Sequence, residues 1–137
     1  MANSSKLLLD TDILSAIMRN VPSAVSRGHA YLTTHDKFTF SVITRYEILR
    51  GLKARNAERQ IEAFGQLCVA SETLYLTNKV IETAAAIYAY LKNNGQLIGD
   101  ADILIAATAL ENDVGLVTNN EDHFKRIARL HIENWLI

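Results

Sequence analysis

Short apolar runs that alternate with helix-like segments restrict the fold of this chain more than any other feature of its sequence. Most of the runs are continuous instead of alternating with polar residues, which is typical of strands that are buried on both faces. They lie at residues 6–9, 38–43, 74–76, 115–118 and 130–132. Strands that alternate with helices predict an α/β fold, with a mostly parallel central sheet of about four or five strands and helices on both faces.

Capping residues mark several of the expected helix ends. Thr11 or Asp12 is expected to cap the first helix, and Thr44 a later one, because Glu47 follows Thr44 at the spacing of a capping box. Residues 93–95 (Asn-Asn-Gly) form a left-handed stop signal. The expected helices are residues 12–19, 44–54, 58–67, 77–93, 100–112 and 121–128, and residues 20–36 form a loop or begin a further helix.

The composition is that of an ordinary globular protein. The length of 137 residues predicts a single domain over residues 1–137. The 14 basic and 15 acidic residues give a net charge of −1, which argues against a protein that binds nucleic acid through overall charge alone. The single cysteine, Cys68, cannot form a disulfide within the chain, and no cysteine–histidine pattern resembles a zinc site.

No segment of the sequence is expected to target the chain to a membrane or to anchor it there. Residues 1–9 lack the apolar region and the cleavage site of a signal peptide. The longest apolar run, around residues 103–110, is much shorter than the ~20 residues that span a bilayer. We therefore expect a cytoplasmic protein, and an unpaired cysteine fits a reducing compartment.

Acidic side chains fall where the expected strands end and where the following helices begin. Asp10 ends the first strand, and Glu47 lies in the first turn of the helix after the second strand. Asp100 and Asp102 begin the helix before the fourth strand, and residues 119–122 (Asn-Asn-Glu-Asp) follow that strand. Ligands of open α/β sheets bind beyond the carboxyl ends of the strands, so several of these groups are expected to converge at one edge.

Carboxylates that converge repel one another, so at least one pKa rises unless a cation is present. Mg²⁺ and Mn²⁺ prefer oxygen ligands and commonly bind one or two carboxylates together with substrate phosphates. Such an ion orients a phosphodiester and lowers the pKa of an attacking water. The acids therefore suggest metal-assisted phosphodiester hydrolysis, although each acid taken alone also has a structural explanation as a helix cap or a partner of a helix dipole.

Four segments in this order resemble the PIN-domain family, and specifically the VapC-type ribonuclease toxins of type II toxin–antitoxin systems in bacteria and archaea. They are residues 8–14 (LLDTDIL), 41–51 (SVITRYEILRG), 98–107 (IGDADILIAA) and 116–124 (LVTNNEDHF). The third is the most specific of the four. The resemblance covers nearly the whole chain, including residues 132–135 (IENW) near its end.

The resemblance implies roles for individual residues. Asp10, Glu47 and Asp102 match the catalytic acids of the family. Asp10 and Asp102 would be the main metal ligands, and Glu47 would bind the metal directly or through water. Four further residues would be auxiliary: Asp100, Thr118, Asn120 and Asp122. Asn120 stands where the four-acid pattern has its last acid, so either Asp122 supplies that charge or the site works with three acids and one or two metal ions.

The resemblance also implies an activity and partners. The activity is that of an endoribonuclease that depends on Mg²⁺, for which Mn²⁺ can substitute, and that leaves a 5′-phosphate and a 3′-hydroxyl. Cleavage of RNA would inhibit growth or translation. The implied partners are an RNA substrate, a cognate VapB-type antitoxin that covers the acidic cleft, and a second copy of the chain in a homodimer. DNA would be bound only indirectly, through the antitoxin at its promoter.

Basic residues near Glu47 are candidates for contacts with RNA phosphates. Arg45 and Arg50 are the best of them, and a solvated helix face explains most of the others. The four histidines show no metal-ligand spacing, and we assign none of them a role.

Two other classes of function are open. A PIN-like binding protein that has lost its activity is disfavoured by the presence of all three main acids. A phosphoacceptor receiver domain is another α/β fold with acids at strand ends, but it requires a lysine after a late strand, and none directly follows residues 115–118.

Overall fold

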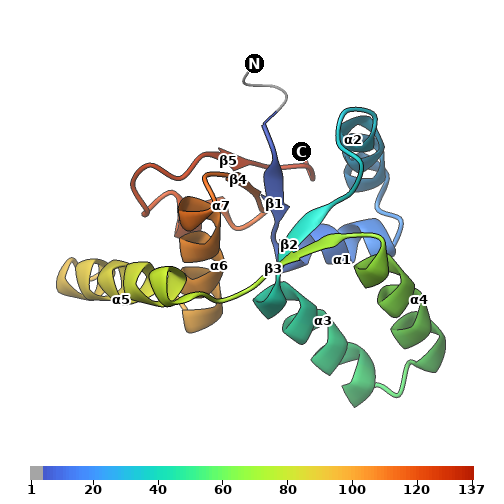
Figure 1. Cartoon of the computed structure of the whole chain (residues 1–137), viewed down its shortest axis with the longest axis horizontal. Coiled ribbons are helices and arrows are strands. Elements are labelled where there is room, and N and C mark those ends of the chain that lie inside the picture. The colour runs from blue at the N-terminus through green and yellow to red at the C-terminus, as the bar shows by residue number, and fades with distance from the viewer. Residues whose placement is uncertain (1–4) are drawn as a thin grey trace.

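Five short parallel strands form the centre of the molecule, and helices lie on either side of them (Figure 1). The computed structural model describes residues 5–137, and the strand order in the sheet is β3-β2-β1-β4-β5. The elements are β1 Leu7–Leu9, α1 Thr11–Met18, α2 Pro22–Leu32, β2 Thr39–Ser41, α3 Val42–Ala54, α4 Glu58–Val69, β3 Glu72–Leu74, α5 Asn78–Asn93, α6 Asp100–Glu111, β4 Gly115–Val117, α7 Glu121–Phe124 and β5 Ile132–Glu133. Every strand pair is parallel, so the predicted α/β fold with a mostly parallel sheet is confirmed.

Two apolar cores lie against the sheet. Leu8 belongs to one of them, whereas Leu7 and Leu9 belong to the other, because successive residues of a strand point to opposite faces. The core of Leu8 is shared with α5 and α6, and the core of Leu7 and Leu9 with α1, α2, α3 and α4. Figure 1 shows the same division, with α5 and α6 on the left of the sheet and α1 to α4 on the right. The edge where the strands end is therefore bordered by α1, α3 and α6.

Two of the predicted caps are wrong. Asp10, not Thr11 or Asp12, caps α1, and its carboxylate accepts a hydrogen bond from the Thr11 backbone N–H. Helix α3 begins at Val42 and is capped by Ser41, whose hydroxyl accepts from the Ile43 backbone N–H. The expected capping box of Thr44 does not form, because β2 ends at Ser41 and the chain turns directly into the helix. Glu47 is thereby free to make other contacts.

Other boundaries also differ from the predicted ones. Residues 22–32 form α2, with Pro22 in the first turn, where its missing N–H costs nothing. Strand β3 lies two residues earlier than expected, because the Glu72 backbone N–H bonds to the Phe38 carbonyl over 2.8 Å and sets the register with β2. The last helix ends at Phe124 and the last strand begins at Ile132. The predicted stop of α5 is confirmed, with Gly95 at φ +66°.

None of the helices within residues 5–137 has both the length and the apolar character needed to cross a membrane. The prediction that residues 1–9 carry no targeting signal falls partly on residues 1–4, which lie outside the described part of the chain.

Gly115, in the interior strand β4, is expected to tolerate a side chain poorly. A Cβ there would lie 2.8 Å from His131 Cδ2 and 2.9 Å from Leu7 Cδ2. Gly115→Ala should therefore lower the free energy of unfolding by about 1–3 kcal/mol, the usual cost of overpacking. Gly65→Ala is the control, because nothing lies within 4 Å of that position in α4, and it should instead stabilise by about 0.5–1 kcal/mol. Urea unfolding of both variants checks this, and a stable Gly115→Ala would contradict the packing.

Candidate active site at the carboxyl edge of the sheet

Thr118 ties the ends of β1 and β4 together at one edge of the sheet. Asp10 follows β1 and Thr118 follows β4, and the two strands pair in parallel. The Thr118 hydroxyl donates to Asp10 Oδ2 over 2.7 Å and accepts from the Asn120 backbone N–H over 2.9 Å. Three of the residues that the sequence singled out, Asp10, Thr118 and Asn120, thus lie together.

Asp10 is a deeply buried carboxyl group, with 5% of its area exposed. Burial, followed by the charge of Asp12, raises the pKa of Asp10 from 3.8 to about 7. The charge of Asp102 adds to this rise, whereas hydrogen bonds from Thr118 and Thr11 oppose it. A carboxylate in this position is destabilised at neutral pH unless a cation lies beside it, and such perturbed groups are typical of functional sites.

Asp12 is an acid of the site that the sequence analysis treated only as a helix cap. Its Oδ2 accepts from the Asn119 backbone N–H over 3.0 Å. Its Oδ1 is buried and has no hydrogen-bond partner among the described residues. Burial raises the pKa of Asp12, and the charge of Asp102 contributes to the rise. The Asp-x-Asp spacing at the start of α1 was the signal that could have identified it.

Glu47 joins the site through Thr11. The Thr11 hydroxyl donates to Glu47 Oε1 over 2.6 Å, and its oxygen lies 3.0 Å from the Thr44 hydroxyl. This contact links α3 to the residue that directly follows Asp10. Glu47 keeps 21% of its side chain exposed, so it faces the opening of the site while Asp10 forms the buried part.

Asp102 lies in the first turn of α6 and faces the segment that follows β4. His123 Nδ1 lies 2.9 Å from Asp102 Oδ2, and the Asn120 side-chain nitrogen lies 3.5 Å from the same oxygen. Asn120 and His123 also contact each other over 2.8 Å. No role was predicted for His123 from the sequence. Its position one helical turn after Asn120 was the signal that it shares the face of α7 that meets Asp102.

Two of the predicted auxiliary acids lie apart from this group. Asp100 is exposed and lines a shallow pocket between α5 and α6. Asp122 has 84% of its side chain exposed and forms an ion pair with Lys125 over 3.1 Å. Asp12, in contrast, acts on Asp10 through its charge and binds the Asn119 backbone N–H.

The two arginines predicted to contact RNA have different surroundings. Arg50 Nη2 lies 3.8 Å from Glu47 Oε2, at the border of the site. Arg45 lies against the Cys68 thiol, and its positive charge lowers the pKa of that thiol, which burial raises by a larger amount. Arg50 is thus placed beside the acids and Arg45 beside α4.

The carboxylates are not gathered around one point. No three Asp, Glu, His or Cys side chains in residues 5–137 are arranged to hold a metal ion, because Glu47 is bonded to Thr11 and Asp102 contacts His123. The donor set nevertheless suits a hard divalent cation, since every group is a carboxylate and Asp12 Oδ1 is buried without a partner among the described residues. An ion would require side-chain rotations that turn Glu47 and Asp102 toward Asp10.

Asn134, near the end of the chain, holds the segment that carries Asn119 and Asn120. Its side-chain nitrogen donates to Asn119 Oδ1 over 3.1 Å and to Glu121 Oε2 over 2.8 Å. Its side-chain oxygen accepts from the Leu136 backbone N–H over 2.9 Å. The Asn119 backbone N–H in turn donates to Asp12. Asn134 therefore positions the segment that binds Asp12, although the carboxylate that it contacts itself is that of Glu121.

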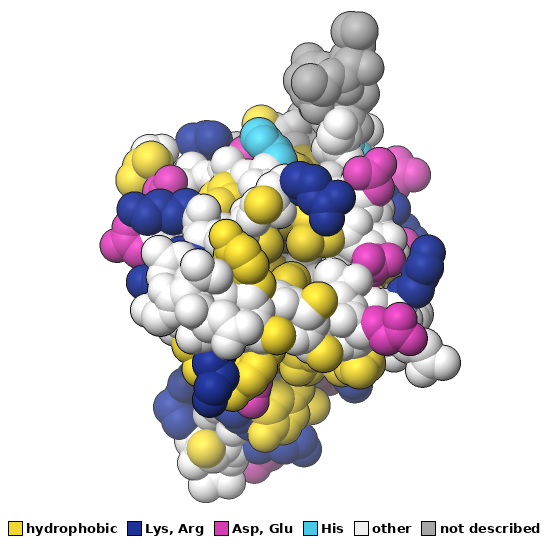
Figure 2. Space-filling model, turned by 90° about the vertical axis from the view of Figure 1, so that its left-hand side faces the viewer, with side chains coloured by type: hydrophobic (Ala, Val, Ile, Leu, Met, Phe, Trp, Pro, Cys, Tyr) yellow, Lys and Arg dark blue, Asp and Glu magenta, His cyan; other side chains and the backbone are white. Residues whose placement is uncertain are grey.

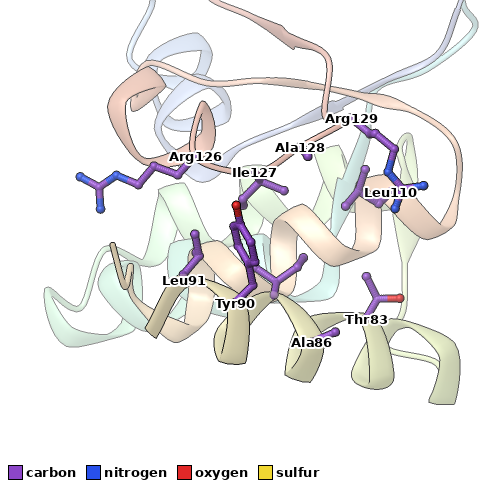
Figure 3. A pocket seen from close by; sticks show the side chains of 10 residues that line it. Thr83, Ala86, Tyr90, Leu91, Leu110, Arg126, Ile127, Ala128 and Arg129 are labelled. Atoms are coloured by element: carbon purple, nitrogen blue, oxygen red, sulfur yellow. The ribbon is translucent and has the colours of Figure 1, made fainter. Parts of the chain in front are cut away.

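A cavity of about 410 Å³ on another part of the surface has no acid in its lining. It lies between α5 and residues 126–129, and Figure 3 shows Tyr90 and Leu91 of α5 facing Ile127 across it. Apolar side chains form most of its wall. The group around Asp10 is therefore the better candidate for an active site.

Comparisons with known proteins agree with this geometry. The PIN domain family model matches residues 7–130. Ribonuclease VapC1 of Methanocaldococcus jannaschii is 32% identical over 129 residues, which cover 94% of this chain and 86% of that protein. The solved structure of VapBC-1 from nontypeable Haemophilus influenzae has a TM-score of 0.84 and 30% identity, covering 96% of this chain and 98% of that one. VapBC2 from Rickettsia felis, bound to a DNA fragment from their promoter, has a TM-score of 0.83 and 26% identity, covering 94% and 98%. The chain belongs to the PIN-domain family, among the VapC ribonucleases.

Proposed function

We propose that this protein is a metal-dependent endoribonuclease that hydrolyses RNA phosphodiester bonds as the toxin of a toxin–antitoxin pair. One observation carries the proposal: Asp10, Asp12, Glu47 and Asp102 form a linked acidic group in which burial raises the pKa of Asp10 to about 7. Family membership gives the reaction class. Cellular RNA is the proposed substrate, so the cytoplasm is the proposed place of action.

Mg²⁺ is the proposed cofactor, and Mn²⁺ can substitute for it. Asp10 and Asp102 would hold the ion, Glu47 would bind it directly or through water, and Asp12 would add the fourth carboxylate. A bound Mg²⁺ polarises phosphodiester oxygens and lowers the pKa of an attacking water. The protein would orient the ligands of the ion, since the Thr118 hydroxyl donates to the Asp10 carboxylate and holds it in place.

A catalytically inactive PIN-like binding protein is the competing function. Asp10 is buried, and the charges of Asp12 and Asp102 raise its pKa further. Retaining these acids together therefore has a cost in stability, and an inactive protein has no use for that cost. The complete acid set therefore favours the enzyme.

RNA cleavage by the purified, antitoxin-free protein tests the proposal. Total RNA incubated with Mg²⁺ or Mn²⁺ should be cut at defined sites that carry 5′-phosphates, and chelation of the ion should stop the reaction. Glu82→Gln removes an exposed acid of α5 and should cleave like the wild type. RNA that stays intact with both ions, while circular dichroism shows a folded protein, would establish the inactive alternative.

Asn134→Asp should weaken the site without touching an acid that binds the ion. The new carboxylate keeps the shape of the side chain but no longer donates to Asn119, and it faces Glu121. We expect Mn²⁺ affinity and cleavage rate to fall about 10–100-fold, as for other residues that orient metal ligands. Calorimetric titration with Mn²⁺ measures the affinity. Asn93→Asp, at an exposed end of α5, is the control, and equal behaviour of the two variants would refute this role.

We further propose a VapB-type antitoxin as a partner, and contact with promoter DNA only through it. The solved relatives support this, since the protein from Rickettsia felis is part of VapBC2 on promoter DNA. The purified chain alone should not shift promoter DNA in a gel, whereas its complex with the antitoxin should.

A homodimer is the proposed assembly of the chain. Hydrophobic side chains gather over the face of the molecule that carries α5, as Figure 2 shows. On α5, Ile81 and Tyr88 are 47% and 39% exposed and line one pocket together with Leu104 of α6, and exposed apolar surface of this kind is typical of protein interfaces. Light scattering should give twice the monomer mass, and Ile81→Glu combined with Tyr88→Glu should return it to the monomer value.

A further inference from the structure

A groove of about 590 Å³ leads away from the acids between α1 and the pair α3 and α4. Thr11 and Glu47 line it where it meets the site, and Arg19 and Arg55 line it as well. Each arginine stands eight residues beyond the site residue on its own helix and caps that helix. At a rise of about 1.5 Å per residue, the arginines lie roughly 12 Å along the groove from the acids.

The two arginines remain available for a ligand. Neither has an ion-pair partner in the described part of the chain, whereas Arg50 lies 3.8 Å from Glu47. Arg19 Nη1 donates to the Ser15 hydroxyl over 2.7 Å, which orients the guanidinium and leaves its other N–H groups unused. Pairs of arginines with free donors are well suited to bind phosphate.

The wall between these charges is open and of mixed character. Met18, Ile48 and Leu52 contribute apolar side chains and Ser15 and Gln60 polar ones, and a Cβ added to Gly51 would meet open space. Apolar and hydrogen-bonding side chains beside cationic groups suit a nucleotide, whose base packs against the wall while its phosphate pairs with an arginine. A phosphodiester bound at the acids must continue in both directions, and this groove begins at Glu47 and at Thr11, the residue next to Asp10.

We propose that this groove carries the RNA strand on one side of the scissile phosphate, with Arg19 and Arg55 on backbone phosphates and a base over Gly51. The inference rests on the proposed function and adds the path of its substrate. A peptide of a protein partner is the other occupant that the groove admits, and the experiment separates the two.

The experiment measures binding instead of cleavage. Asp10→Asn protein, which should not cut its ligand, is titrated into fluorescent single-stranded RNA between about 50 and 200 mM salt. Arg19→Gln or Arg55→Gln should each weaken binding and make the slope of log affinity against log salt less steep by about 0.7, and the double variant by about 1.4, the value for one and two lost phosphate contacts. Gly51→Leu should weaken binding and leave the slope unchanged, because it fills the groove and removes no charge.

Lys92→Gln is the matched control, since it removes a positive charge at the far end of α5. Arginine variants that bind RNA like this control would overturn the inference. If the arginine variants bind RNA like the control but no longer bind the antitoxin, the groove holds a peptide of that partner. Both outcomes leave the proposed function standing if the unsubstituted protein still cleaves RNA, and failure of that cleavage is the separate result that removes the function.

Discussion

Asp10→Asn is expected to abolish RNA cleavage and, in the absence of metal, to stabilise the fold at neutral and higher pH. Asp10 is a proposed metal ligand, so its loss should lower the rate by more than the 10–100-fold that is typical of residues around metal ligands. Asparagine keeps the acceptor for the Thr11 N–H and removes a charge that burial and Asp12 disfavour.

The stability gain has a defined pH dependence. The pKa of Asp10 is raised from 3.8 to about 7 in the folded protein, so the folded state binds more protons than the unfolded state between these values. Stability of the wild type therefore falls as the pH rises from about 4 to about 7, and it changes little above that range. The difference between the two pKa values corresponds to a loss of at most roughly 4 kcal/mol in the free energy of unfolding.

Thermal unfolding from pH 4 to pH 8 measures this dependence. The curve of Asp10→Asn should be flatter than that of the wild type and should lie above it at pH 8. Asp36→Asn, which removes an exposed charge before β2, should follow the wild type. An Asp10→Asn protein that melts well below the wild type at pH 8 would mean that the helix cap matters more than the repulsion.

Addition of Mn²⁺ or Mg²⁺ should have the second large effect, because the ion offsets the repulsion that burial creates. A ligand that binds only the folded state at a hundred times its Kd stabilises by about 2.7 kcal/mol. The gain should be larger at pH 8 than at pH 6, because protons compete with the ion at Asp10.

Melting curves with and without Mn²⁺ check this effect. Asp10→Asn and Asp102→Asn should lose most of the stabilisation, and Glu82→Gln should keep it. An equal gain in all four proteins would show that the ion acts elsewhere on the surface.

The sequence was sufficient to predict the fold class and to single out Asp10, Glu47 and Asp102 as candidate acids, whose roles stay predictions. Continuous apolar runs identify buried parallel strands, and acids at their ends identify the edge where ligands bind. Asp12 was missed because its local position is fully explained by a helix start. Its role depends on Asn119, which reaches it only because β1 and β4 are neighbours in the sheet.

The capping box at Thr44 illustrates the opposite error. The local pattern was sound, but the backbone of β2 already placed Ser41 as the cap. Tertiary contact then gave Glu47 a different partner, Thr11. The same few residues can end a strand or cap a helix, and the local sequence does not determine which of the two roles each residue takes.

The hydrogen bonds that hold the acidic group join distant parts of the sequence, and this has a consequence for synthesis of the protein. The bond from Thr118 to Asp10 joins residues 108 positions apart, and the wall of the site rests on Asn134. A growing chain on the ribosome therefore contains Asp10, Asp12 and Glu47 long before it contains what holds them. The arrangement of these acids should therefore form only after the segments that carry Thr118 and Asn134 have been synthesised and have folded against the first strand.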